Sequence, residues 1–317
     1  MSYVRGKDTN MKNVTLEQLL EAGAHFGHQV TRQNPKARDF VFEARDNIHI
    51  IDLAKTKEGL DEAAMFVKEL SKRGGTMIIL GAKRQAEPVV KEAAKRVKEA
   101  GSAGDGLYFV TNRWIGGILT NYPEVSKNFK RLKDLYRFMD TPSEKARFTK
   151  KEVSLMDKER QKLDSFYWGV QDMKHIPDAV FIIDTHLEDL AVREAISTKV
   201  VRLGITDTNS DPTMIDYPIP ANDDAVGSVQ LILDHIVEAW LEGRTAGEEL
   251  RAKTEAENVK EAEKVAKAAE KAKEVAEKKA ESKPEKKVEP KVEKSVVVAE
   301  KKSPVKKATV KKTTTSK

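Results

Sequence analysis

One stretch organises this chain: Asn112-Arg113-Trp114-Ile115-Gly116-Gly117-Ile118-Leu119-Thr120-Asn121-Tyr122. Before it, short apolar runs alternate with segments of helical periodicity, which predicts a domain of strands and helices. After it the sequence becomes a long charged helical segment, and sheet-like sequence resumes near Pro177. We interpret residues 112–122, called the junction below, as the joint between a sheet and a helical insertion. Gly116-Gly117 would let the chain turn out of the sheet there.

The sheet is predicted from short apolar runs separated by helices. Thr76–Leu80 has the pattern of a strand buried on both faces. Similar strands are predicted at Leu107–Val110, Asp178–Asp184 and Val200–Ile205, and helices at Thr56–Gly74, Gly81–Gly101, Glu188–Ser197 and from Asn222 or Asp223 to Gly243. This alternation predicts an α/β fold with a doubly wound, mostly parallel sheet covered on both faces.

Two local patterns precede this sheet. Thr15-Leu16-Glu17-Gln18 fits a capping box, so a short helix should begin there and stop at Gly23. Phe40–Phe42 and Ile48–Leu53 are predicted to be strands joined by a hairpin turn at Ala44–Asn47.

The insertion has the apolar spacing of a coiled coil. Its first arm carries Val125, Phe129, Leu132, Tyr136 and Met139, and its second carries Val153, Met156, Arg160, Leu163, Tyr167 and Val170. Spacings that alternate between three and four residues predict two antiparallel helices. We therefore expect an α/β domain at residues 1–245 with an inserted coiled-coil hairpin at residues 123–172.

The remaining segment, residues 246–317, is predicted to be a charged, low-complexity tail. It is rich in Ala, Glu and Lys and is expected to be partly helical up to about Ala280, with a disordered Lys-rich arm from Lys301. Residues 250–317 hold 21 Lys or Arg and 12 Glu, a net charge of +9, so residues 1–249 carry the remaining 36 basic and 39 acidic residues, a net of −3. If the folded part binds RNA, it must do so through local basic patches.

The composition argues against a disulfide-linked, secreted or membrane-spanning protein. The chain has no Cys, which excludes disulfides and thiolate metal sites. Its start lacks a secretory apolar stretch, and no apolar run approaches the ~20 residues needed to span a bilayer. We expect a cytoplasmic protein without a membrane partner.

The patterns of nucleotide binding and catalysis are weak. Gly81-Ala82-Lys83-Arg84-Gln85 matches neither a dinucleotide fingerprint nor a P-loop. Asp184-Thr185-His186, at a strand end, is the best acid–base candidate, but no nucleophile accompanies it and a structural role is favoured. We expect no catalytic residues, no cofactor and no small-molecule substrate, with an enzyme or nucleotide-binding protein as the second hypothesis.

Two polar patterns could hold a metal ion. His25 and His28 lack further ligands at close spacing, and a capping or core role is favoured for them. Asp207, Asn209 and Asp211 offer oxygen ligands, but the same residues form Asx turns. We predict no metal site and leave both possibilities open.

The exposed positions of the hairpin are rich in Lys and Arg. They include Lys127, Lys130, Arg131, Lys133, Arg137, Lys145, Arg147, Lys150, Lys151, Lys158 and Lys162, interleaved with acidic residues. Such a surface is either a solvated face, an arm that contacts phosphates or an arm that docks a protein. Arg113-Trp114 at its base would add a cation and a stacking face for RNA.

Several sequence motifs, in order, resemble the family of bacterial small-subunit ribosomal protein two. They are Leu19–His28 with Asn34-Pro35-Lys36, Ile48–Leu53, the junction, Leu163 with Gln171–Met173, Pro177-Asp178 with Ile182–Asp184, Asp207–Pro212 and Ile215–Asp224. The match runs collinearly from about Asn13 to Arg244, and the tail lies outside it.

The resemblance implies a doubly wound domain with a protruding helical hairpin and no enzymatic activity. It also implies binding to small-subunit ribosomal RNA between head and body, next to other small-subunit proteins, and recruitment of ribosomal protein one. The residues expected to contact RNA are Lys36, Arg38, Arg45, Asn47, Arg113, Trp114, Lys127, Lys130, Arg131 and Lys133.

Overall fold

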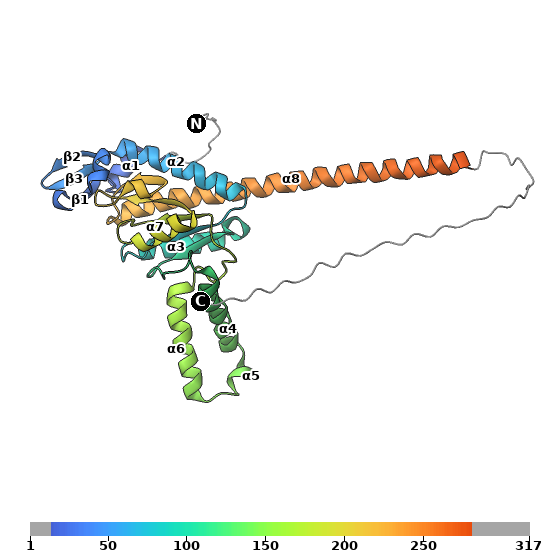
Figure 1. Cartoon of the computed structure of the whole chain (residues 1–317), viewed down its shortest axis with the longest axis horizontal. Helices are drawn as coiled ribbons and strands as arrows, with labels where there is room; N and C mark the ends of the chain where they lie inside the picture. The colour runs from blue at the N-terminus through green and yellow to red at the C-terminus, as the bar shows by residue number, and fades with distance from the viewer. Residues whose placement is uncertain (1–13, 281–317) are drawn as a thin grey trace, which may run out of the picture. The chain divides into compact units, whose positions relative to one another are not determined.

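A five-stranded parallel sheet lies at the centre of the computed structural model, which describes the backbone of residues 14–280 and the side chains of residues 14–254 (Figure 1). The strands are β4 (Met77–Leu80), β5 (Leu107–Val110), β6 (Ala179–Ile182), β7 (Val201–Thr206) and β8 (Tyr217–Pro220). Their spatial order is β5-β4-β6-β7-β8. The predicted α/β class and parallel sheet are confirmed. Strand β8, which was not predicted, lies at an edge, where its two prolines cost no interior ladder hydrogen bonds.

Helices cover both faces of this sheet. One face packs against α2 (Leu53–Lys72), α3 (Ala86–Glu99) and the start of α8 (Val226–Ala280). The other packs against α7 (Asp189–Thr198), the junction and the base of the hairpin. Alternate residues of β4 serve the two cores: Met77 and Ile79 face the first, and Ile78 and Leu80 the second. The strand order reverses between β4 and β6, and folds of this kind hold ligands outside the strand ends at that point.

A second, antiparallel sheet precedes the first. It contains β1 (Phe26–Gln29), β2 (Val41–Arg45) and β3 (Ile48–Ile51) in the order β1-β3-β2. The predicted hairpin turn is present, with Asp46 and Asn47 both at positive φ. Strand β1 was not predicted, because its four residues show no alternation and it is a strand only through pairing with β3.

Short helices complete this region and the loops. Helix α1 (Leu16–Glu21) begins at the expected capping box of Thr15 and Gln18. The 3-10 helices are η1 (Val30–Arg32), η2 (Pro35–Phe40), η3 (Gly101–Gly104) and η4 (Pro212–Met214).

The insertion forms a helical hairpin that projects from the sheet (Figure 1). Helix α4 (Tyr122–Asp140) leads through the short α5 (Pro142–Lys145) to α6 (Lys150–Tyr167), which returns beside α4. The buried side chains Val125, Phe129, Leu132 and Leu135 lie on α4, whereas only Tyr167 is buried on α6. Two helices that lie side by side are therefore present at the predicted insertion, and the coiled-coil hairpin remains a prediction.

The last helix corrects one expectation. Helix α8 spans Val226–Ala280 and does not end at Gly243. A Cβ on Gly243 would lie 2.3 Å from the carbonyl oxygen of Lys68, and one on Gly247 would lie 2.2 Å from that of Lys72. These glycines let α8 approach α2 closely, so they serve packing and not termination.

The chain divides into two units, residues 1–257 and 258–317. The predicted boundary at residues 245/246 remains a prediction, and the Lys-rich arm from Lys301 lies outside the described residues. No helix in the described part of the chain is long and apolar enough to cross a membrane.

Candidate functional site

The junction is held by one buried carboxylate. Glu194 of α7 is 6% exposed and accepts hydrogen bonds from the indole Nε1 of Trp114 (3.3 Å) and from the backbone N–H of Gly117 (2.7 Å). It also accepts the backbone N–H of Leu119 (3.1 Å) and both the N–H and the hydroxyl of Thr120 (3.2 Å each). Gly117 has φ +96, a backbone conformation that side chains disfavour. The predicted turn out of the sheet is thus present, and α7 anchors it.

Trp114 is part of the core. It is 3% exposed and packs in the same cluster as Ile118 and Leu119. Its ring has no free face for a base, so the expectation that it contacts RNA by stacking is wrong. The sequence did not predict that Trp114 is buried, because its hydrogen-bond partner Glu194 lies 80 positions further along the chain.

The other RNA candidates are exposed, and they form two groups. Arg38, Arg45 and Lys130 have no side-chain hydrogen bond or ion pair to any described residue, and the exposed Arg113 donates only its backbone N–H, to Asn112. Four cations instead have acidic partners. These pairs are Lys36–Asp211 (2.6 Å), Lys127–Glu124 (2.6 Å), Arg131–Glu159 (2.8 Å) and Lys133–Asp172 (2.8 Å). Asn47 sits exposed in the β2–β3 turn.

A cluster of carboxylates surrounds Lys83 at the carboxyl end of the parallel sheet, where the strand order reverses. Lys83 follows β4, and its Nζ lies 3.1 Å from Asp184, 2.8 Å from Asp223 and 2.7 Å from Asp224. Burial alone would lower the pKa of Lys83, but the hydrogen bonds to Asp223 and Asp224 outweigh it and raise that pKa. Lys83 is therefore a permanent internal cation that joins three segments of the chain.

Two carboxyl groups in this region are hard to ionise. Burial, together with Asp184 and Asp207, raises the pKa of Asp223 to about 7, although Lys83 opposes the shift. Burial and the charge of Asp184 raise the pKa of Glu188 to about 7, with Arg113 opposing. A surplus of negative charge at this edge disfavours a phosphate, which argues against the nucleotide hypothesis at the usual ligand position of the fold.

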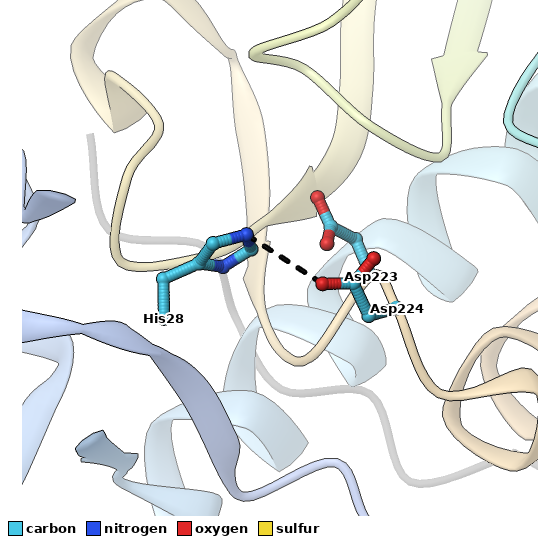
Figure 2. A group of neighbouring side chains, drawn as sticks. All are labelled: His28, Asp223 and Asp224. Atoms are coloured by element: carbon cyan, nitrogen blue, oxygen red, sulfur yellow. Dashed lines mark ion pairs between the residues drawn. The ribbon is translucent and has the colours of Figure 1, made fainter.

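His28 lies at the rim of the cluster, facing Asp223 and Asp224 (Figure 2). Its Nδ1 is 3.0 Å from Asp207, and its Nε2 is 3.6 Å from Asp224. The hydrogen bond to Asp207 raises the pKa of His28. His28, Asp223 and Asp224 offer ligand atoms within 4.8 Å of one another, so together they could hold a divalent cation that would share both carboxylates with Lys83. His25 is not among these ligands; burial lowers its pKa, and its ring packs 4.0 Å from that of Phe26.

The remaining polar candidates have structural partners. Asp211 accepts the N–H and hydroxyl of Thr213, and Asp207 accepts the hydroxyl of Thr208, as expected for turns that bond their own backbone and side chains. Asp184 accepts the N–H groups of His186 (3.0 Å) and Leu187 (2.8 Å), which shapes the loop that leads to α7. The structural role favoured for Asp184 is therefore the one observed.

The fold and these sites define an α/β scaffold that carries a helical hairpin with exposed basic residues. A model of the family described as Ribosomal protein S2 matches residues 19–243. The chain belongs to this family of structural, non-enzymatic proteins of the small ribosomal subunit. The matched range holds the sheet, the hairpin and the Lys83 cluster, and membership implies association with ribosomal RNA and other ribosomal proteins.

Proposed function

We propose that the protein binds small-subunit ribosomal RNA between the head and body of the subunit, as a structural constituent that supports translation in the cytoplasm. The observation that carries this proposal is that the predicted RNA contacts Arg38 in η2, Arg45 on β2 and Lys130 on α4 are exposed and have no acidic partner among the described side chains. A folded surface that leaves arginines unpaired presents them to an external anion, and phosphate is the anion that RNA supplies in a regular array.

The three cations without acidic partners among the described residues come from two separate parts of the fold. Arg45 lies on the small antiparallel sheet and Arg38 lies in the 3-10 helix η2 just before β2, whereas Lys130 lies on the projecting hairpin (Figure 1). One protein with two such surfaces can contact two RNA segments, which suits a position between head and body.

The paired cations add to these surfaces. Lys127 and its partner Glu124 are 68% and 63% exposed, and Arg131 and Glu159 are 50% and 43% exposed. Exposed ion pairs of this kind are worth about 0–1 kcal/mol, so a phosphate can replace the carboxylate at small cost.

The small sheet also carries exposed apolar side chains. Phe42 is 72% exposed, Phe26 49% and Ile48 38%, all on the small sheet. Exposed aromatic and aliphatic side chains gathered on one sheet are typical of protein docking. These side chains support recruitment of ribosomal protein one by the small sheet, beside the RNA contacts expected of Arg38 and Arg45.

Affinity for small subunits that lack this protein, measured against salt concentration, tests the RNA proposal. Arg38→Gln with Arg45→Gln should flatten the slope of log affinity against log salt by about 2, and Lys130→Gln by about 1. Lys98→Gln changes another exposed lysine, on α3 and outside the predicted RNA contacts; it is the matched control and should change the slope little.

Binding that is independent of salt would contradict phosphate contacts. If Lys130→Gln leaves RNA crosslinks unchanged but removes crosslinks to a neighbouring protein, the hairpin is instead a protein-docking arm.

A further inference from the structure

A small pocket opens beside α7, at the carboxyl end of the parallel sheet. Its volume is about 270 Å³, and its wall includes His186 after β6, Val192 of α7, Asp211 after β7 and Asn34 before η2. We call it the α7 pocket. Small-molecule sites usually have volumes of about 300–1,000 Å³, so this one suits a single ring system more than a whole cofactor.

The floor of the pocket is apolar and its rim is polar. Val192 is 2% exposed and Ile215 6%, while Met214 at the rim is 37% exposed. The side-chain oxygen of Asn34 caps the N–H of Lys36, which leaves the amide N–H groups without a partner in the described chain. The ring of His186 likewise has no hydrogen bond to a described residue.

The charges around the pocket are already balanced. Asp189 pairs with Arg193 at 2.5 Å, and Asp211 pairs with Lys36 at 2.6 Å. Two carboxylates in the wall disfavour a phosphate inside the pocket. An apolar floor with free donors at the rim suits a planar group that has apolar faces and a polar edge, which is the chemistry of a nucleobase.

Two cations lie beside the pocket, where they could contact the phosphates on either side of a bound nucleobase. The side chain of Arg193 is 71% exposed and that of Lys36 is 55% exposed. Their partners Asp189 and Asp211 are 44% and 20% exposed. Pairs at the surface are worth about 0–1 kcal/mol, so both cations can turn to the phosphates that flank a bound base.

We propose that the α7 pocket receives one unpaired base of small-subunit RNA, with Lys36 and Arg193 on its flanking phosphates. The proposal rests on the RNA-binding function above and assigns it a specific subsite. Phosphate contacts alone would position the protein, whereas a base in this pocket would fix its register on the RNA.

The test uses the full chain and small subunits assembled without this protein. Met214→Trp fills the mouth of the pocket, and Met65→Trp makes the same change at an exposed methionine of α2. Chemical probing of base edges should show one unpaired base that is protected by the wild type and by Met65→Trp but reactive with Met214→Trp. Affinity should fall roughly tenfold for Met214→Trp, within the range for one stacked base, and the salt slope should fall by at most about 2, because only Lys36 and Arg193 hold the flanking phosphates.

Three results would overturn the proposal. One is that Met214→Trp binds with wild-type affinity and protects the same bases. Another is that the salt slope falls by more than about 2, which would mean that phosphate contacts away from the pocket are lost. The third is that a photocrosslinker at position 214 captures a protein and no RNA. By contrast, failure of the wild type to bind the subunit in a salt-dependent way would refute the proposed function itself.

Discussion

The indole N–H of Trp114 donates to the carboxylate of Glu194 across 80 positions of sequence. The same carboxylate accepts three backbone N–H groups of the junction, so one buried anion neutralises the unpaired donors of an irregular turn. The hairpin begins at Tyr122, directly after these contacts, and its direction relative to the sheet follows from them.

Replacing Glu194 with Gln should destabilise the fold by about 3–5 kcal/mol, because the amide NH₂ would face backbone donors and leave them unpaired. Urea denaturation measures this effect. Glu159→Gln removes an exposed carboxylate from α6 and should cost under about 1 kcal/mol. An equal loss of unfolding free energy in the two variants would contradict the anchoring role of Glu194.

Trp114 should matter through packing. Trp114→Ala removes a side chain that is 3% exposed and should cost about 3–5 kcal/mol, whereas Trp114→Phe retains much of the ring and should cost about half as much or less. Thermal unfolding of the free protein checks this. A Trp114→Ala variant that is fully stable and assembles normally would contradict packing of Trp114 at the root of the hairpin.

Lys83→Met should lower stability by about 3–5 kcal/mol at pH 8, because it leaves Asp184, Asp223 and Asp224 without their shared cation. Lys91→Met, which loses only an exposed pair with Glu87, is the control and should cost under about 0.5 kcal/mol. Because His28, Asp223 and Asp224 could hold a divalent cation, added zinc or magnesium should raise the Tm of Lys83→Met more than that of the wild type. If added zinc or magnesium leaves the Tm of both proteins unchanged, no metal ion replaces the ammonium group of Lys83.

Glu188→Gln should stabilise the protein at pH 8 and have little effect at pH 4.5. The folded state raises the pKa of Glu188 to about 7, so this group favours folding while protonated and loses that contribution as the pH rises from about 4.5 to 7. The expected gain at pH 8 is about 1–2 kcal/mol after allowance for solvent screening. Denaturation at both pH values measures it, with the exposed Glu43→Gln as a charge-matched control. A gain of the same size at pH 4.5 would have a cause other than ionisation.

The sequence by itself determined the elements whose signals are local. Apolar runs such as Met77–Leu80 marked the buried strands, the three- and four-residue spacing of α4 and α6 marked the hairpin, and Thr15 with Gln18 marked the start of α1. Each of these signals depends on residues within a few positions of one another, where backbone geometry sets the period.

Only the tertiary structure decided what distant residues do together. Strand β1 exists because β3 lies beside it, and α8 passes Gly243 because α2 lies against that glycine. Lys83 meets Asp223 across 140 positions, and Trp114 is buried on Glu194 instead of facing RNA. Burial and charge pairing depend on which surfaces the fold brings into contact, and no local period encodes that.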